Sequence, residues 1–346
     1  GQNWGFPTYK WEKMAKDNYS WWQARLKYMV NYLDAYRIDH VLGFFRIWEI
    51  PLTAKWGLLG QFNPAMPLTK DSIESYGVAF DKRRSLYPYI TEEILLNYFG
   101  IQAGDVKENY LFSNESGEFE FKPEFNTQQK IADYFSAKKK RTAKEDLICQ
   151  GLYRLLCQVL FLPDKRYADT YHPRISYKDN ESFKALDKAQ KEAYVRLYEE
   201  YFYYRHNEFW KQQGLQKLPA LLSATSMLSC GEDLGMIPSC VPEVMSELHL
   251  FSLEIQRMPK KLGVEFGIPY FAPYTSVCST STHDMSPLRL WWTENREKTQ
   301  RFYNTMLFEQ GEAPLYCEPR VVEKIIYQHL QSPAMWVIIP IQDWLA

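Results

Sequence analysis

The sequence predicts an α/β protein in which a parallel β/α barrel carries a large, mainly helical inserted subdomain. Three observations lead to this fold class. Near the start of the chain a helical pattern is followed at once by a strand pattern. A long central stretch of different character then intervenes, and after residue 222 short apolar segments alternate with stretches of helix length. Such alternation is typical of successive βα units around a parallel sheet.

The first pair of elements lies between Ser20 and Leu42. Apolar residues recur at helical spacing from residue 20, and we expect this helix to end near Ala35. The pattern then changes to alternation over residues 36–42, which predicts a short strand. Because successive side chains of a strand point to opposite faces, Arg37 and Asp39 should project from the same side.

The central stretch, from about residue 51 to residue 222, is interpreted as an insertion. Its features are a turn-rich segment at 61–64, a polar hairpin over 114–120 and a basic run at 138–141. A second helical pattern covers residues 192–210. We expect the basic run to be a solvated helix face.

The last third of the chain contains four short apolar segments, which we expect to be strands. They lie at residues 226–230, 251–255, 275–278 and 336–340, separated by stretches long enough for helices. The sequence shows neither an internal repeat of fixed period nor a low-complexity tract, which argues against solenoids and propellers.

Charge and cysteine content restrict the possible partners. The 346 residues include 41 basic and 42 acidic side chains, a net charge of -1. This balance favours neither nucleic acid nor a membrane surface as a partner. No apolar run approaches the ~18 residues of a membrane helix, and no signal-peptide pattern opens the chain. The 6 cysteines form no C-x-x-C pair, which favours reduced thiols and a cytoplasmic location.

Aromatic side chains make up 16% of the chain. They can fill a bulky core, or they can line a sugar-binding cleft, since flat rings cover the C–H faces of pyranoses. Composition alone favours the core, because any domain of this size buries much apolar surface.

Three acidic residues stand just beyond predicted strands: Asp39, Glu232 and Asp284. The carboxyl ends of parallel strands form the catalytic face of β/α barrels. Glycoside chemistry needs one carboxylate as nucleophile or base and a second carboxylic acid to protonate the leaving oxygen. Taken singly, each acid could equally pair with a neighbour or cap a helix. Three together, each with a polar companion (Arg37, Asp233, His283), favour catalysis.

Other chemistries have weaker support in the sequence. The 6 histidines include no pair at i, i+4, and no further His/Cys cluster supplies a metal-ligand set. No G-x-S-x-G elbow and no glycine-rich phosphate loop are present. We therefore expect neither a metal nor a cofactor.

Four stretches resemble glycoside hydrolase family 77, the 4-alpha-glucanotransferases or amylomaltases, and especially their disproportionating-enzyme-2 branch. They are GQNWGFPTY at 1–9, YRIDHVLGFFRIWEIP at 36–51, GEDLGMIP at 231–238 and STHDM at 281–285. They follow the family's order, and the resemblance covers nearly the whole chain. The resemblance implies a (β/α)8 TIM-type barrel that is incomplete at both ends of this chain.

The resemblance also implies catalytic roles. Asp39 would be the nucleophile, Glu232 the general acid/base, and Asp284 the third carboxylate, which binds sugar hydroxyls. Arg37, on the same strand face as Asp39, favours the ionised nucleophile. Glu232 is expected to start protonated, because it is buried beside an ionised carboxylate.

Two further residues would bind substrate. His283 would donate a hydrogen bond to a sugar hydroxyl, and Trp4 would stack on a sugar ring near the cleaved bond. The chain departs from commoner bacterial members of the family, which have Asp-His-Phe-Arg-Gly where DHVLG stands here at 39–43.

The implied activity is a retaining transfer of glucosyl units from maltose or malto-oligosaccharides to a branched alpha-glucan. The implied domains are a barrel part at 1–51, the inserted subdomain at 52–222 and a second barrel part at 223–346. Two alternatives stay open. One is a non-catalytic glucan-binding fragment, and the other is an alpha-glucan hydrolase with the same three carboxylates.

Overall fold

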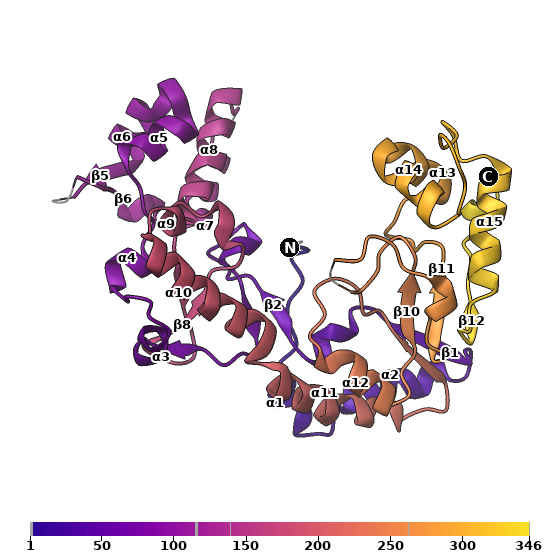
Figure 1. Cartoon of the computed structure of the whole chain (residues 1–346). Coiled ribbons are helices and arrows are strands. Elements are labelled where there is room, and N and C mark those ends of the chain that lie inside the picture. The colour runs from indigo at the N-terminus through magenta and orange to yellow at the C-terminus, as the bar shows by residue number, and fades with distance from the viewer. Residues whose placement is uncertain (1–2, 115–116, 139, 262, 346) are drawn as a thin grey trace. The chain divides into compact units, whose positions relative to one another are not determined.

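The computed structural model describes residues 3–114, 117–138, 140–261 and 263–345 (Figure 1). The start of the 1–9 motif, the tip of the expected hairpin and one residue of the basic run lie outside these ranges. The chain folds into two compact units. The first unit contains the segment that ends at Tyr9, together with Arg46–His206. The second unit contains Lys10–Phe45 and the chain from Asn207 onward.

The second unit is built on a parallel sheet of five short strands. They are β1 (Ala35–Ile38), β9 (Leu228–Gly231), β10 (Ser252–Ile255), β11 (Ser276–Ser279) and β12 (Trp336–Val337). Strand β1 pairs with β9, and β10 pairs with β11, which pairs with β12. A parallel bridge between Cys230 and Phe251 joins β9 to β10. Among the described residues, β1 and β12 each pair with one strand only, so they are the edges of this arrangement.

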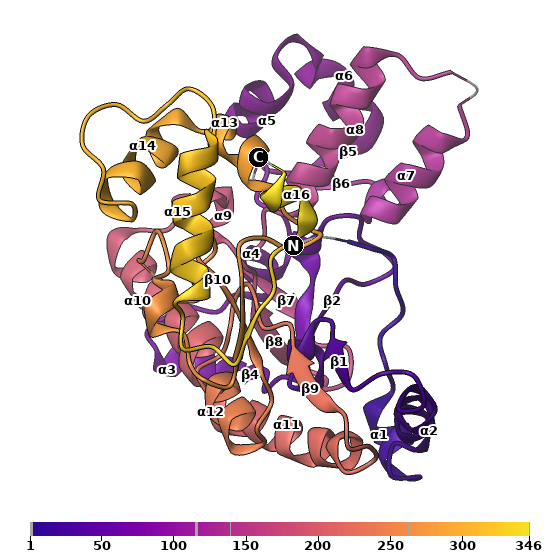
Figure 2. The same ribbon diagram turned by 90° about the vertical axis from the view of Figure 1, so that its right-hand side faces the viewer.

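The helices of the second unit occupy the connections between these strands (Figure 2). Helices α1 (Trp11–Ala15) and α2 (Ser20–Met29) precede β1, and α11 (Asn207–Leu222) precedes β9. Helix α12 (Cys240–Glu247) connects β9 to β10, while α13 (Leu288–Glu294), α14 (Arg296–Thr305) and α15 (Pro319–Leu330) connect β11 to β12. Helix α16 (Ile341–Trp344) follows β12.

Two clusters of buried apolar residues belong to the core of the second unit. Four buried strand-side residues (Phe251, Leu253, Ile255, Val277) make one cluster on the sheet. Helices α13 to α15 bury a second cluster around Trp292 and Phe302, both 0% exposed. The apolar stripe of α15 explains its place, because valines and isoleucines recur at helical spacing on its buried face.

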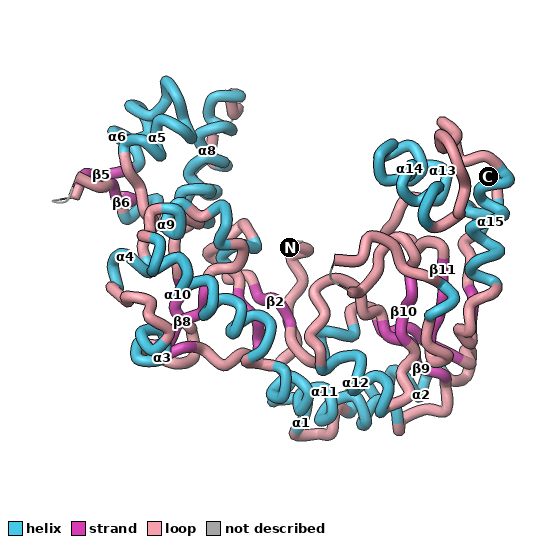
Figure 3. Tube along the Cα trace, viewed as in Figure 1, coloured by secondary structure: helices cyan, strands magenta, loops and turns pink. Residues whose placement is uncertain are grey.

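The first unit is mainly helical, with three small antiparallel sheets (Figure 3). Its longer helices are α5 (Glu92–Phe99), α6 (Ala103–Tyr110), α7 (Gln128–Ser136), α8 (Ala143–Leu156) and α10 (Lys188–Glu199). Shorter ones are α3 (Lys70–Ser75), α4 (Lys82–Leu86) and α9 (Glu181–Lys184). The strands are β2 (Ile47–Glu49) with β3 (Gln61–Asn63), β4 (Leu68–Thr69) and β7 (Phe161–Pro163) with β8 (Thr170–Pro173), and β5 (Leu111–Ser113) with β6 (Phe119–Phe121).

The structure confirms the α/β class and corrects several expected boundaries. The four predicted strands of the last third are present as β9 to β12, and β5 with β6 forms the predicted hairpin. The first helix ends at Met29, not near Ala35, and the strand after it ends at Ile38. The helix expected over 192–210 is divided into α10, a π-helical turn at Glu200–Tyr204 and α11. Within the ranges that the structure describes, no helix could span a membrane.

Buried histidines should make the first unit sensitive to acid. His206 is 1% exposed, and burial lowers its pKa to about 4 from a usual value near 6.5. The unfolded chain therefore binds a proton at a higher pH than the folded chain, so stability is lost as pH falls from 6.5 towards 4. At about 1.4 kcal/mol for each pKa unit, this loss reaches about 3 kcal/mol.

We expect His206→Gln to reduce the difference in unfolding free energy between about pH 7 and about pH 4.5. Urea denaturation at the two pH values measures this difference. His249→Gln, at an exposed position of the second unit, is the control. Equal acid sensitivity in wild type and His206→Gln would contradict the assignment.

Candidate active site

Two of the predicted carboxylates are neighbours at the carboxyl edge of the sheet. The register of β1 and β9 pairs Ile38 with Gly231, the last residues of the two strands, so Asp39 and Glu232 are the first residues beyond them. Backbone hydrogen bonds continue past the strand ends. The N–H of Glu232 donates to the carbonyl of Ile38 at 2.9 Å, and the N–H of Val41 donates to the carbonyl of Glu232 at 3.0 Å.

The carboxylate of Glu232 is oriented by the backbone on both sides. Oε2 accepts the N–H of His40 at 3.0 Å, and Oε1 accepts the N–H of Leu234 at 2.9 Å. His40 itself has a φ of 52°, a left-handed conformation that ends the extended backbone of β1 next to Glu232. Each carboxylate oxygen has a second lone pair, so Glu232 can still hold a proton or contact a ligand.

Asp39 is exposed and is held by a cation on its own strand. Its Oδ1 lies 2.8 Å from a guanidinium nitrogen of Arg37, and the two side chains are 76% and 33% exposed. The interaction agrees with the prediction that Arg37 and Asp39 project from one face. It leaves Oδ2 of Asp39 available to react.

Arg37 and His283 line a common cavity in the second unit. The cavity has a volume of about 350 Å³, and strands β1, β9, β10, β11 and β12 all contribute to its wall. Arg37 comes from β1, whereas His283 comes from the loop after β11. The structure therefore brings together two residues that are 246 positions apart in the sequence.

Asp284 is the third predicted carboxylate and lies on the same loop as His283. Nε2 of His283 is 3.1 Å from Oδ2 of Asp284, and both side chains are 69% exposed. Both side chains are accessible to a ligand. When Nε2 of His283 carries a proton, it can donate a hydrogen bond to Asp284 and orient the carboxylate. No direct contact joins Asp284 to Asp39 or Glu232 among the contacts of the described chain.

A fully buried aspartate anchors the loop that carries His283 and Asp284. Oδ2 of Asp343, on α16, accepts the hydroxyls of Thr280 at 2.6 Å and Ser281 at 2.7 Å. Oδ1 of Asp343 accepts the N–H of Leu288 at 2.8 Å. The guanidinium of Arg257, 5% exposed, donates to the carbonyls of Thr280 and Ser286. The loop is thus held at both ends.

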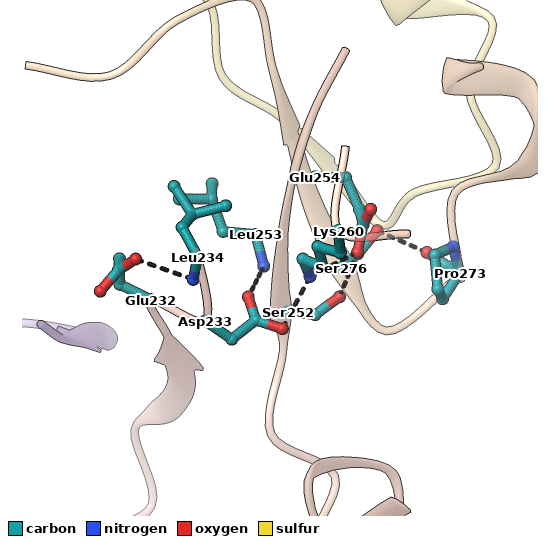
Figure 4. A network of polar contacts seen from close by, with 9 residues as sticks. All are labelled: Glu232, Asp233, Leu234, Ser252, Leu253, Glu254, Lys260, Pro273 and Ser276. Atoms are coloured by element: carbon teal, nitrogen blue, oxygen red, sulfur yellow. Dashed lines mark hydrogen bonds and ion pairs between the residues drawn. The ribbon is translucent and has the colours of Figure 1, made fainter. Parts of the chain in front are cut away.

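A second buried group lies directly beside Glu232 (Figure 4). Asp233 is 1% exposed, and its Oδ1 accepts the N–H of Leu253 at 3.0 Å. Its Oδ2 lies 2.7 Å from Nζ of Lys260, which is also 2.7 Å from Oε1 of Glu254. Burial raises the pKa of Asp233 to about 6, and the Lys260 cation opposes this rise.

Sequence reasoning missed Asp343, Arg257 and Lys260, and it noted Asp233 only as a companion of Glu232. None of the three lies in a motif that resembles a catalytic signature. Their partners are distant in the sequence: Asp343 and Thr280 are 63 residues apart, and Lys260 and Asp233 are 27 residues apart. The only local signal was the isolated acid of the segment IQDW at 341–344, in an otherwise apolar stretch.

Trp4 belongs to the first unit, where its side chain is 69% exposed. Its proposed stacking role stays a prediction. Thiol chemistry is disfavoured at the sheet, because burial raises the pKa of Cys278 to about 11 and also raises that of Cys230. In the part of the chain that the structure describes, no three His, Cys, Asp or Glu side chains gather as a metal site.

Comparison with known proteins shows the family of the chain. The family model described as 4-alpha-glucanotransferase, glycoside hydrolase family 77, matches residues 1–346. The chain belongs to glycoside hydrolase family 77. This family 77 chain is 44% identical over 349 residues to the 4-alpha-glucanotransferase DPE2 of Oryza sativa subsp. japonica. That match covers 100% of this chain and 37% of the rice protein, so the chain spans little more than a third of that relative.

Shorter stretches of the family 77 chain match other 4-alpha-glucanotransferases. The protein of Chlamydia pneumoniae is 52% identical over 74 residues, 21% of this chain and 13% of its own length. The chloroplastic/amyloplastic protein of Solanum tuberosum is 38% identical over 79 residues, 22% of this chain and 14% of its own length.

The anchor at Asp343 gives a prediction for the stability of the family 77 chain. Asp343→Ala removes the acceptor for three donors, and an unsatisfied buried donor costs about 1–3 kcal/mol. The hydroxyls of Thr280 and Ser281 can rotate to other acceptors, which reduces the cost of losing Asp343. We therefore expect the unfolding free energy to fall by about 3 kcal/mol in total. Urea denaturation measures it, and hydrogen exchange should show faster exchange at Leu288. Glu265→Ala removes an exposed ion pair with Arg301 and is the matched control. Equal stability of the two variants would contradict an anchoring role.

Proposed function

We propose that this chain carries the catalytic carboxylates of a 4-alpha-glucanotransferase that works by a retaining double displacement. The observation that supports this most directly is the register of β1 and β9, which places Asp39 and Glu232 each one residue beyond the carboxyl ends of two adjacent parallel strands. A retaining glycosidase needs two carboxyl groups close to one scissile bond, one to attack and one to transfer the proton. We further infer that the open parallel sheet is part of a (β/α)8 barrel.

In the first step Glu232 gives its proton to the glycosidic oxygen while an oxygen of Asp39 bonds to the anomeric carbon. The bond from that carbon to the leaving oxygen breaks, which leaves a glycosyl ester on Asp39. In the second step the 4-hydroxyl of an acceptor sugar attacks the anomeric carbon. Glu232 now takes the hydroxyl proton, and Asp39 leaves as a carboxylate.

Other residues would bind the sugars around this bond. Arg37 orients Asp39, and the pair of Asp284 and His283 would hold hydroxyls of the glucosyl ring. Trp4 would stack on a neighbouring ring. Maltose or malto-oligosaccharides would be donors and branched alpha-glucans acceptors, in a cytoplasmic protein. The segment 52–222 would be a subdomain inserted between the barrel parts 1–51 and 223–346.

The experiment is to give the full-length protein maltose and glycogen, and to follow free glucose together with labelled glucosyl groups in the glycogen. Glucose release with incorporation supports the transferase. Glucose without incorporation would indicate a hydrolase, since water then replaces the acceptor hydroxyl. Glycogen binding without either product would indicate a glucan-binding protein.

A further inference from the structure

Lys260 connects two strands of the sheet at the position of the proposed general acid/base (Figure 4). Its Nζ lies 2.7 Å from Oδ2 of Asp233, which is adjacent to Glu232 in the chain, and 2.7 Å from Oε1 of Glu254 on β10. The Lys260 side chain is 19% exposed and that of Asp233 is 2% exposed. Two carboxylates therefore share one cation in a largely dry environment.

The segment 232–234 is held from two directions. On the side of β1, Ile38 accepts the N–H of Glu232, and His40 donates to the Glu232 carboxylate. On the side of β10, Asp233 accepts the N–H of Leu253 and pairs with Lys260. A buried carboxylate without a partner is costly, so removal of the cation should release this second attachment.

We propose that Lys260 is a positioning residue for catalysis: through its ion pair with Asp233 it fixes the segment that presents Glu232 to the scissile bond. This inference rests on the proposed function. Lys260 does not touch substrate in this role. It acts by keeping Asp233 ionised and attached to β10, and a shift of Asp233 moves the adjacent Glu232.

This role makes the reaction depend on the ionisation of Asp233. Protonation of Asp233 weakens both its ion pair and its bond from Leu253. The charged groups that act on Asp233 are Lys260, which favours the ionised form, and Glu254, which opposes it. Since burial and these groups give Asp233 a pKa of about 6, the rate of transfer should fall in the wild type as pH drops through this value.

The test is the pH profile of kcat for glucosyl transfer from maltose in the full-length protein. The acid limb is the part of the profile in which kcat falls as pH decreases. Lys260→Met should shift this limb to higher pH by about one unit, because removal of the nearby positive charge raises the pKa of Asp233. Glu254→Gln should move it downward, since the competing carboxylate is lost. Lys260→Arg retains the cation and should restore the wild-type limb. The neighbouring exposed Lys261→Met is the matched control.

A merely structural role for Lys260 predicts a different result. Lys260→Met would then lower the unfolding free energy but leave the acid limb superimposed on that of Lys261→Met, which would overturn the proposal. If Lys260→Met does not fold, Glu254→Gln provides the test. An acid limb of Glu254→Gln at the same pH as that of the wild type, or at higher pH, also contradicts the proposed role of Lys260. A wild-type protein that transfers no glucosyl groups would instead refute the proposed function.

Discussion

Asp39→Asn is expected to lower the rate of glucosyl transfer by at least about 10⁴-fold, because an amide cannot form the glycosyl ester on which the second step depends. The substitution should leave the fold intact. The Asp39 side chain is 76% exposed, and its Arg37 partner can still donate to the amide oxygen. Substrate binding should therefore change much less than kcat. Initial rates of label transfer from maltose to glycogen measure the effect.

The matched control for Asp39→Asn lies at the opposite end of the same strand. Asp34 is exposed and directly precedes β1, at the amino end of the strand, where barrel enzymes do not carry catalytic groups. Asp34→Asn makes the same chemical change and should retain activity within about twofold. Comparable activity of wild type and Asp39→Asn would exclude Asp39 as the nucleophile.

The sequence predicted β9 to β12 because each is a short apolar run, and it predicted β1 from the alternation of its residues. It predicted their ends less well, and the reason is visible at β1. Alternation continues through residue 42, yet the strand stops at Ile38, because His40 adopts a positive φ and bonds to Glu232. That bond joins residues 192 positions apart. A local pattern contains no information about such a partner.

Some residues of the candidate site could be predicted from local sequence patterns, and others could not. Asp39, Glu232 and Asp284 were recognisable because strand ends and neighbouring polar residues mark them in the sequence. Asp343 and Lys260 were not, since an aspartate in a short apolar helix or a lysine in a loop is ordinarily solvated. Their significance comes from burial and from tertiary contacts. The residues that hold a site are harder to predict than those that form its reactive surface.

Glu232→Gln should lower transfer from maltose by about 10²–10⁴-fold, because the glucose leaving group must be protonated as its bond breaks. Both oxygens of Glu232 accept backbone N–H groups, so the new amide must turn its NH₂ towards one of these donors. A smaller loss of stability should accompany the kinetic effect. Glu247→Gln is the control for the kinetics, because Glu247 is exposed at the end of helix α12, which follows β9.

The choice of donor separates the loss of the acid from the loss of local structure. Fluoride leaves without protonation, so alpha-glucosyl fluoride should still glucosylate Asp39 in Glu232→Gln. The second step then lacks its base, and the glucosyl ester should accumulate on the peptide that contains Asp39, where mass spectrometry detects it. Glu232→Gln could instead slow the first step equally with maltose and with alpha-glucosyl fluoride and give no adduct. This result would mean that Glu232 supports the site without transferring the proton.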